Sequence, residues 1–444
     1  MGLATFRGGV HPYEGKDLSK DRPVKTLLPQ GEMVYPLSQH IGAPAKPVVK
    51  KGDHVLVGQI LGEAGGFVSA NVISSVSGTV KAVEPRLTVS GNMVNSVIVE
   101  NDNLYEGVQG LGDKRDASKL SKDEIRAIIK DAGIVGMGGA GFPTHVKLTP
   151  KDDSKIDYVI VNGAECEPYL TSDYRMMLEE PERIVGGLKV ILKLFPNAKG
   201  VIGIEDNKPD AIASMTKAAE KEANIQVVPL KTKYPQGGER TLIYAVTGRK
   251  INSTMLPADV GCVVNNVDTV ISIYMAVCET TPCIRKIITV TGDAIKEPQN
   301  FKVPTGICYR ELVEAAGGFK EEPEKVISGG PMMGQALFTL DVPVMKASSA
   351  VLALTKDQVA ELEPSACIRC GRCASVCPGH IVPQKIMEAA ERRDLDLFVK
   401  YDGMECCECG CCSFICPARR PLTQAFKSMR LAVRAAAQAK KAKA

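Results

Sequence analysis

The sequence of 444 residues contains no tryptophan, and aromatic residues make up only 5% of it. Its 55 lysines and arginines nearly balance its 51 aspartates and glutamates, for a formal net charge of +4. A nucleic-acid-binding surface usually combines clustered positive charge with aromatic rings that stack on bases. We therefore expect no nucleic-acid partner.

Long apolar runs are also missing. The most apolar window, residues 263–278, is interrupted by Asn265, Asn266 and Asp268, whereas a membrane-spanning helix needs about 20 apolar residues. The opening MGLATFRGGVHPYEGKD has Arg7 and glycines where a signal peptide has an apolar run. We expect a soluble chain without a secretion signal, and its length predicts several domains.

Cysteine, by contrast, is abundant and unevenly placed. Ten of the fifteen cysteines lie between residues 367 and 416. Without a secretion signal the thiols are expected to be reduced, so the pattern indicates metal or redox chemistry rather than a disulfide framework.

Two cysteine runs share the spacing C-x2-C-x2-C-x3-C-P. This is the ligand spacing of [4Fe–4S] clusters. In ferredoxins with two clusters, the fourth cysteine of each run ligates the cluster held by the other run. Zinc sites use separated C-x2-C pairs instead. The spacing predicts two [4Fe–4S] clusters; the first would be held by Cys367, Cys370, Cys373 and Cys416, and the second by Cys406, Cys409, Cys412 and Cys377. Cys407 and Cys411 fall outside this register and are predicted to be non-ligands.

Residues 381–403, between the two runs, have apolar residues at helical spacing and predict a mainly helical ferredoxin domain. Clusters carry single electrons, so another part of the chain must supply or accept them.

A glycine-rich stretch, 133-GIVGMGGAGFPTHVKL-148, is the candidate for that part. Gly136, Gly138 and Gly141 satisfy G-x-G-x-x-G, but residues 123–134 before them have helical periodicity, whereas a dinucleotide fold requires a strand there. Two interpretations remain open. The glycines serve only the local fold, or the loop brings backbone N–H groups close to a phosphate or a flat ring.

The stretch 157-DYVIVNGAECEPYLTSDYR-175 predicts a buried strand that ends in a polar turn with Asn162, Glu165 and Glu167. Two acids would repel a phosphate, so we expect them to meet ribityl or ribose hydroxyls or a ring edge. Two more polar stretches follow, 234-YPQGGERTLIYAVTGR-249 and 261-GCVVNNVDT-269.

Together these motifs resemble the flavin- and NADH-binding subunits of respiratory complex I, which carry GRGGAGFPT…K, NADESEP, Y-x-x-GEET and NNVET. This chain has GMGGAGFPTHVK, NGAECEP, YPQGGERT and NNVDT in the same order. The resemblance implies an FMN site formed by Gly136, Gly138, Gly139, Gly141, Asn162, Glu165, Asn265, Asn266 and Thr269. It implies that NADH or the flavin edge is faced by Phe142, Lys147, Glu167, Tyr234 and Glu239. Ala164 replaces the family's aspartate, and Gly238 replaces one of its paired glutamates.

The flanking segments predict further modules. Residues 51–59 and 74–83 resemble the halves of a biotinyl/lipoyl-type barrel without a carrier lysine, and residues 285–355 resemble a β-grasp domain. The predicted fold class is multidomain α/β: a barrel-sandwich N-terminal module, an α/β FMN/NADH-binding domain, a β-grasp domain and a mainly helical two-cluster ferredoxin domain. The predicted bounds are 1–110, 111–283, 284–357 and 358–430, followed by a basic tail at 431–444.

This order of modules, with 6-FRGGVHP-12 and 329-GGPMMG-334, resembles the family of C subunits of Rnf complexes. The resemblance implies a peripheral subunit on the cytoplasmic face of a bacterial cell membrane. It would exchange hydride between NAD(H) and FMN, pass electrons through both clusters, and assemble with a ferredoxin-type B subunit and membrane subunits, reaching ferredoxin indirectly. The alternatives are a soluble flavoprotein of the cobalamin-reductase type, a diaphorase subunit of complex I or a hydrogenase, and an electron-relay scaffold without a working nucleotide site.

Overall fold

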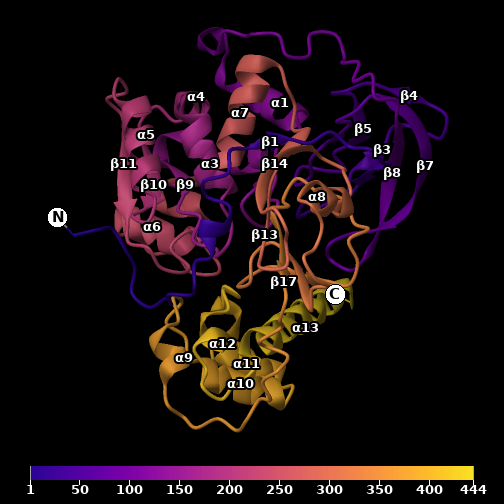
Figure 1. Ribbon diagram of the computed structural model, residues 1–444. Helices are drawn as coiled ribbons and strands as arrows, with labels where there is room; N and C mark the ends of the chain where they lie inside the picture. Colours follow the sequence, from indigo (N-terminus) through magenta and orange to yellow (C-terminus); the bar gives the residue numbers. More distant parts are fainter. Residues whose placement is uncertain (1, 444) are drawn as a thin grey trace.

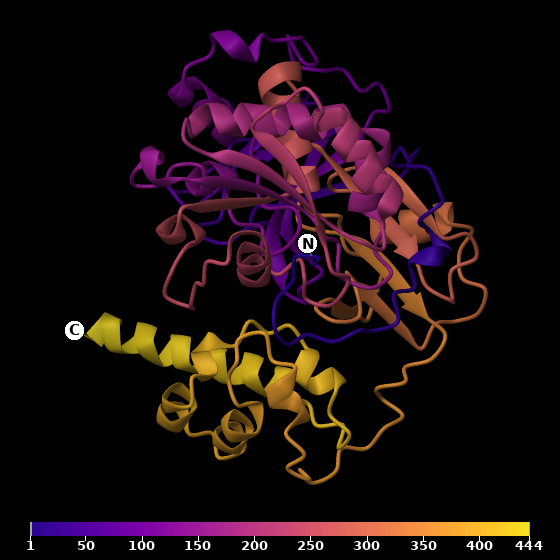
Figure 2. The same cartoon turned by 90° about the vertical axis from the view of Figure 1, so that its left-hand side faces the viewer.

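The computed structural model describes residues 2–443 and contains three α/β or β units stacked above a helical module (Figure 1). Before the first unit, residues 2–32 form an N-terminal segment that crosses the molecule. Figure 2 shows part of this segment running between the upper units and the helical module.

The first unit packs two small antiparallel sheets against each other, with strand orders β2-β8-β7-β4 and β3-β5-β6. Their inward residues, Met33, Tyr35, Leu61 and Val97 among them, form a fully buried core. The strands are β2 (Met33–Pro36), β3 (Lys46–Pro47), β4 (His54–Val55), β5 (Ile60–Glu63), β6 (Val72–Ile73), β7 (Gly78–Leu87) and β8 (Met93–Asn101).

The second unit is a parallel sheet in the order β11-β10-β9-β12, with strands β9 (Tyr158–Gly163), β10 (Lys199–Glu205), β11 (Ile225–Leu230) and β12 (Cys262–Asn266). Both faces are covered, because Val159 and Val161 point into one apolar cluster and Ile160 into another. A strand that is buried on both faces has a nearly continuous apolar sequence, and the stretch YVIVNG, which forms β9, has this pattern.

The helices of this unit are α1 (Lys122–Asp131), α2 (Thr144–Lys147), α3 (Ser172–Glu179), α4 (Pro181–Leu194), α5 (Pro209–Ala219), α6 (Glu239–Thr247) and α7 (Val267–Glu279). Helix α1 begins with a capping box formed by Ser121 and Glu124. It directly precedes the glycine loop, as the periodicity of residues 123–134 predicts.

The third unit is a six-stranded sheet in the order β1-β14-β13-β17-β15-β16, with α8 (Tyr309–Ala315) packed on it. Its strands are β1 (Lys25–Thr26), β13 (Arg285–Thr291), β14 (Gln299–Pro304), β15 (Lys325–Ser328), β16 (Gln335–Leu337) and β17 (Ala350–Leu354). Strand β1 comes from the N-terminal segment and pairs in parallel with β14.

Buried charges join the units. Lys346 donates to the carbonyl oxygens of Asn71 (2.5 Å) in the first unit and Gly133 (2.7 Å) in the second. Burial alone would raise the pKa of Asp268 on α7, but the cations of Arg285 and Lys286 on β13 hold it down to about 2. The second and third units are therefore fixed to each other by ion pairs as well as by apolar contacts.

The helical module contains α9 (Arg372–Ser375), α10 (Pro383–Glu391), α11 (Leu395–Lys400), α12 (Cys411–Phe414) and α13 (Leu422–Lys443). Residues 381–403, whose apolar residues have helical spacing throughout, form two helices and not one. Residues 392–394 interrupt the segment, because Arg393 adopts a left-handed conformation and Asp394 caps α11. Helix α13 continues across residue 430, so the predicted basic tail is the outer half of this helix. Across residues 2–443, no helix combines the length and apolarity that a membrane crossing requires.

Candidate functional site

The sheet order of the second unit predicts where a ligand binds. The strand order reverses at β9, since β10 lies on one side of it and β12 on the other. In open parallel sheets, ligands bind beyond the carboxyl ends of the strands at such a switch point. Asn162 lies at the end of β9 and Asn265 and Asn266 end β12, so three asparagines lie at this carboxyl edge.

The glycine loop, residues 135–143, lies against the same edge. Gly136 N donates to Phe142 O (2.8 Å), which closes the loop, and Met137 N donates to Thr269 Oγ1 (2.9 Å) at the start of α7. A Cβ on Gly138 would lie 2.9 Å from Asn266, so only glycine allows this approach. Residues 138–140 are exposed, which leaves their backbone available to a ligand.

The first unit supports the loop from behind. The ring of His145 is buried, and its Nε2 lies 3.0 Å from Phe67 O. Gly141, at φ +66°, packs against the Gln39 carbonyl. The barrel-like unit therefore has a structural role at this site, and the buried His145 ring is its contact with the loop.

A second loop, residues 234–238, closes the edge from the other side. Asn162 Nδ2 donates to Gly237 O (2.8 Å), and Gly237 N donates to Cys166 Sγ (3.2 Å). Gly238 is the N-cap residue of α6. The half-buried Lys147 donates to Val264 O (2.7 Å) and lies 3.8 Å from Glu239, and burial lowers its pKa against the opposing effect of Glu239.

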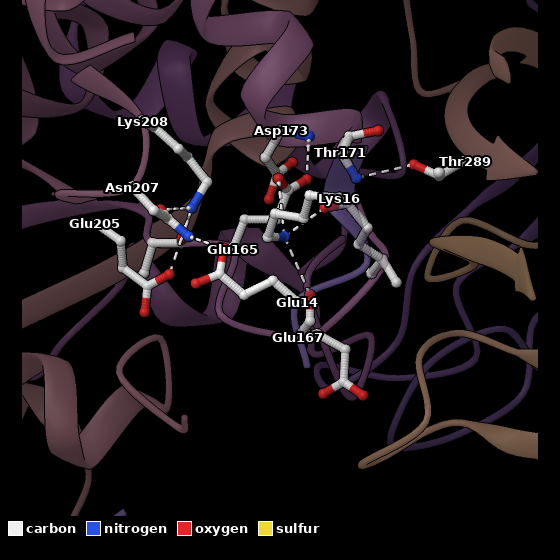
Figure 3. A network of polar contacts seen from close by, with 12 residues as sticks. Glu14, Lys16, Glu165, Glu167, Thr171, Asp173, Glu205, Asn207, Lys208 and Thr289 are labelled. Carbon is white, nitrogen blue, oxygen red and sulfur yellow. Dashed lines mark hydrogen bonds and ion pairs between the residues drawn. The ribbon is translucent and has the colours of Figure 1, made fainter. Parts of the chain in front are cut away.

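The acidic turn after β9 is held by a lysine from far away in the sequence. Lys16, in the N-terminal segment, is buried and donates to Glu167 O (3.1 Å) and Leu170 O (2.5 Å), with its Nζ 3.6 Å from Glu165 (Figure 3). Burial raises the pKa of Glu165, and Lys16 and Lys208 oppose that rise. The turn thus holds the buried Glu165 carboxylate beside the Lys16 cation.

The carboxylates of this turn have distinct partners. Glu165 Oε1 accepts from Asp173 N (2.7 Å), and Asp173 Oδ2 accepts from Asn266 Nδ2 (2.6 Å). Burial, and secondarily Glu165, raises the pKa of Asp173 to about 7. Glu167 Oε1 accepts from Met332 N (2.7 Å) and Met333 N (3.2 Å), so it joins the edge to the third unit.

Several buried polar atoms at the edge have no hydrogen-bond partner within residues 2–443: both amide atoms of Asn265, both amide atoms of Gln236, the Tyr234 hydroxyl and Glu165 Oε2. Asn265 is 2% exposed and Gln236 is fully buried. Leaving a buried polar group unpaired costs about 1–3 kcal/mol, so these atoms indicate a ligand rich in donors and acceptors. An FMN with its ribityl hydroxyls, phosphate and ring carbonyls fits this set together with the open backbone at residues 138–140.

Several cysteines of the helical module lie in one cluster, in which Cys377 and Cys412 are buried and Cys373, Cys406 and Cys416 pack against them. Burial raises the pKa of Cys412 to about 12, and the neighbouring thiols of Cys406 and Cys377 add to the rise. Burial is also the main cause that raises the pKa of the Cys373 thiol, and the nearby Cys416 thiol adds to that rise. The fourth cysteine of each run therefore lies near the other run, which fits the crosswise ligation of two clusters.

Structure adds two residues to those predicted from sequence. Gln236 lies within the motif YPQGGERT, but only its burial without a hydrogen-bond partner identifies it as a candidate ligand-binding residue. Lys16 has no sequence signal, because the turn it holds lies about 150 residues away. Of the predicted set, the glycines, asparagines, Thr269, Lys147, Glu239 and Tyr234 gather at the carboxyl edge, whereas the Glu167 carboxylate is engaged by the third unit.

Four family profiles match the chain: an RnfC barrel sandwich hybrid domain over residues 4–104, a Nuo51 FMN-binding domain over 129–275, an SLBB domain over 287–336 and a 4Fe-4S dicluster domain over 360–424. These matches confirm the predicted fold class. They suggest FMN and two 4Fe–4S clusters as cofactors.

Two relatives match nearly end to end. The chain is 47% identical over 443 residues to the C subunit of the proton-translocating ferredoxin:NAD(+) oxidoreductase complex of Clostridium ljungdahlii, covering 99% of this chain and 96% of the relative. It is 46% identical over 423 residues to the C subunit of the Na(+)-translocating complex of Acetobacterium woodii, covering 95% and 96%. A crystal structure of an NAD+-reducing [NiFe]-hydrogenase in the H2-reduced state aligns with a TM-score of 0.50 at 19% identity, over 63% of this chain and 54% of that one, and shares the fold.

Proposed function

Since the chain belongs to the family of C subunits of the ion-translocating ferredoxin:NAD(+) oxidoreductase complexes, the Rnf complexes, we propose that it exchanges hydride between NAD(H) and FMN and relays single electrons through two [4Fe–4S] clusters. A flavin, when bound, converts between the two-electron chemistry of a nicotinamide and the one-electron chemistry of a cluster. The chain is thus one subunit of an oxidoreductase complex.

The observation that carries this proposal is that the carboxyl edge and a cysteine run meet at one residue. Tyr234 closes the edge beside the unpartnered Gln236, and its carbonyl oxygen lies 3.8 Å from Cys411 Sγ in the second run. A nucleotide site and a cluster site that share a wall allow electrons to pass between them without a diffusing carrier.

The residues take the following proposed roles. Backbone of the glycine loop and the side chains of Asn162, Asn265, Asn266 and Gln236 hold FMN, and Lys16 fixes the acidic turn beneath it. The residues proposed to surround FMN are Gly136, Gly138, Gly139, Gly141, Asn162, Glu165, Gln236, Asn265, Asn266 and Thr269. Those proposed to meet the nicotinamide nucleotide or the flavin edge are Phe142, Lys147, Glu167, Tyr234, Gly238 and Glu239. The proposed iron ligands are Cys367, Cys370, Cys373, Cys377, Cys406, Cys409, Cys412 and Cys416.

No side chain at the edge is needed as an acid or base for hydride exchange itself. The residues orient and desolvate: Lys147 is held by Val264 O, and the Gly138–Asn266 contact fixes how closely the backbone approaches the ligand. Pre-placing both reactants in this way is how a site lowers the barrier without proton transfer.

Membership of this family supports a proposal for the chain's location and partners. We propose a peripheral subunit on the cytoplasmic face of a bacterial cell membrane, held there by partner subunits. The partners are the other Rnf subunits, among them a ferredoxin-type subunit and membrane subunits, with ferredoxin reached indirectly.

The test is to purify the chain anaerobically, count iron, sulfide and flavin, and add NADH while following flavin and cluster absorbance. The proposal predicts about eight irons per chain, bound flavin, and bleaching of the flavin by NADH. Eight irons without any response to NADH would instead indicate a relay scaffold whose nucleotide site does not work. About four irons would contradict the ligand assignment.

A further inference from the structure

The two cysteine runs have the same spacing but lie in different surroundings. Every residue from 361 to 370 is exposed, including Cys367 and Cys370 of the first run. In the second run Cys409 and Cys412 are buried, as is the non-ligand Cys411. Equal spacing therefore does not imply equal access to the flavin edge or to solvent.

The second run packs directly on the wall of the candidate flavin site. Cys409 and Cys411 belong to one apolar cluster with Tyr234 and Val10, against which Cys166 and Met332 also pack. Cys411 is fully buried, and its Sγ faces Tyr234 O at 3.8 Å. Tyr234 therefore lies between the acidic turn on one side and the second run on the other.

A second contact joins the same loop to the third unit. Gly410 adopts φ +83°, and a Cβ there would lie 3.0 Å from Met332 O. Met332 N in turn donates to Glu167 of the acidic turn (2.7 Å). Met332 thus bridges the second cysteine run and a carboxylate at the flavin edge.

An ion pair fixes the start of the second run. Glu405, directly before Cys406, lies 3.1 Å from Arg240 on α6 and accepts from Ser253 N (2.8 Å). Helix α6 begins at the loop that closes the edge, so this contact and the Tyr234 contact hold the second run to one wall.

Within residues 2–443, the first run meets the N-terminal segment near its end, where Val376 packs against the cluster that contains Val10 and Tyr234. Gly9 N, in the N-terminal segment, donates to Val376 O (2.8 Å), and the next residue, Cys377, is the one that lies near Cys406 and Cys412. This contact therefore lies next to Cys377, which is a proposed ligand of the second cluster and not of the first. Cys367 and Cys370 lie on the exposed linker, which Figure 2 shows looping away from the upper units. Cys373, on α9, is half-buried and packs against the core of the helical module.

We propose that the two clusters act in a fixed order: the cluster held by Cys406, Cys409, Cys412 and Cys377 exchanges electrons with the flavin edge across Tyr234, and the cluster held by Cys367, Cys370, Cys373 and Cys416 exchanges them with a partner redox protein. Cys411 is a positioning residue that seats the inner run on the Tyr234 carbonyl. This inference rests on the proposed function and adds the order of the two clusters along the electron path.

The electron balance is consistent with this order. Oxidation of one NADH to NAD+ releases two electrons and one proton; the proton leaves to solvent, and each cluster accepts one electron. In reverse, two reduced clusters and one proton convert one NAD+ to NADH. The inner cluster must be emptied or filled through the outer one between turnovers.

The experiment uses a matched pair of variants, Cys370→Ala and Cys409→Ala, which remove the second cysteine of each run. The full chain with FMN is reduced, freed of excess reductant, and mixed rapidly with NAD+ while cluster absorbance is followed. Cys370→Ala is expected to keep a rapid cluster reoxidation phase at about half the amplitude of the unmodified chain, since one of two clusters remains. Cys409→Ala is expected to lose that phase and to retain only slow reoxidation of its remaining cluster.

The opposite pattern, or a rapid phase in both variants, would overturn the proposed order. If the unmodified chain does not react with NAD+, the proposed function fails, and the order is then tested separately by reducing the flavin with light and following which variant's cluster fills rapidly. These two failures are distinguishable because light reduction does not involve the nucleotide.

A second measurement covers the case in which a variant loses both clusters. The unmodified holoprotein is treated briefly with an iron chelator, and the cysteines released are alkylated and mapped by mass spectrometry. The order predicts early labelling of Cys367 and Cys370 while the rapid phase with NAD+ persists. Early labelling of Cys406 and Cys409, with the first run still protected, would contradict it.

Discussion

The carboxyl edge of the parallel sheet and the cysteine-rich module are built by different means. At the edge, hydrogen bonds such as Met137 N to Thr269 Oγ1 and Asn162 Nδ2 to Gly237 O hold the loops in place. In the module, a small apolar core around Ile386, Phe398 and Phe426 is surrounded by thiols. Among residues 2–443, no three His, Cys, Asp or Glu side chains converge as they would around a single metal ion.

This difference indicates which part of the molecule depends on a bound cofactor for its folding. The edge is complete as a fold and lacks only partners for a few buried polar atoms. The module places its thiols by spacing and by a modest core, so iron is expected to contribute much of its folding free energy, as metals do in other small metal-binding domains.

The largest expected effect tests this contrast. Removing iron from the holoprotein with a chelator is expected to unfold residues 366–418 while the parallel sheet stays folded, because only the module relies on metal ligation. Hydrogen exchange measured by mass spectrometry should show loss of protection in the module and unchanged protection in β9, β10 and β12. Equal loss in both regions would contradict the comparison.

The next effect separates ligands from bystanders within the module. Cys412→Ala is expected to lose one cluster, which lowers the iron content from about eight to about four per chain. Cys407→Ala and Cys411→Ala, the matched controls in the same loop, are expected to keep the full content. Iron analysis of the anaerobic proteins measures this, and cluster loss in either control would mean that the ligand register is wrong.

At the edge, removing an unpartnered amide is expected to weaken flavin binding without unfolding the chain. Asn265→Ala is predicted to raise the dissociation constant for FMN roughly tenfold to hundredfold, which corresponds to a lost hydrogen-bonding group of about 1–3 kcal/mol. Fluorescence titration of the flavin-free protein provides the measurement, with the exposed Asn197→Ala as a control. Unchanged affinity in Asn265→Ala would show that this side chain serves the fold alone.

Asp173 gives the edge a dependence on pH. Its pKa is raised by burial to about 7, above its usual value. The folded state therefore holds the proton more tightly, and stability falls as pH rises from about 4 to about 7 and then levels off. Asp173→Asn, which keeps an acceptor for Asn266, is expected to flatten this decline and to gain about 1–2 kcal/mol relative to the parent above pH 7.

Denaturant unfolding at pH 5 and pH 8 measures the effect of Asp173→Asn on the free energy of unfolding. The groups that face Asp173 are Glu165, Asp268, Lys286 and Asn266, and they are unchanged in the variant. A variant whose stability keeps the parent's dependence on pH would assign that dependence to the other buried acids of the turn.

The smallest effect concerns the contact between the two regions. Glu405→Gln removes the charge that pairs with the half-buried Arg240, and such pairs contribute at most about 1 kcal/mol. We expect slightly faster proteolysis of the exposed linker at residues 358–370 and unchanged iron content. Asp396→Asn, at an exposed position on α11, is the control. Equal proteolysis rates in the parent and Glu405→Gln would mean that the ion pair does not hold the module in place.

Much of the cofactor chemistry could be predicted from sequence because it depends on local patterns. The cysteine spacing predicts the iron ligands within short loops, and the module brings Cys373 near Cys416 and Cys377 near Cys406. The parallel strand β9 was predictable because both of its faces are apolar.

The remaining features depend on contacts between distant residues. Lys16 reaches the acidic turn across about 150 residues, and Gln236 is marked only by burial without a partner. The break at residues 392–394 arises from a left-handed residue and a cap rather than from a change in periodicity. Likewise, identical spacing in the two cysteine runs gives no hint that Cys367 and Cys370 are exposed whereas Cys409 and Cys412 are buried.

The most direct test of the account is an electron count. The chain carrying FMN and both clusters is fully reduced, freed of excess reductant and mixed anaerobically with NAD+. Two electrons from the flavin and one from each cluster predict about two NADH formed per chain. A yield of about one NADH would mean that the clusters are not connected to the flavin, and no NADH at all would contradict a working nucleotide site.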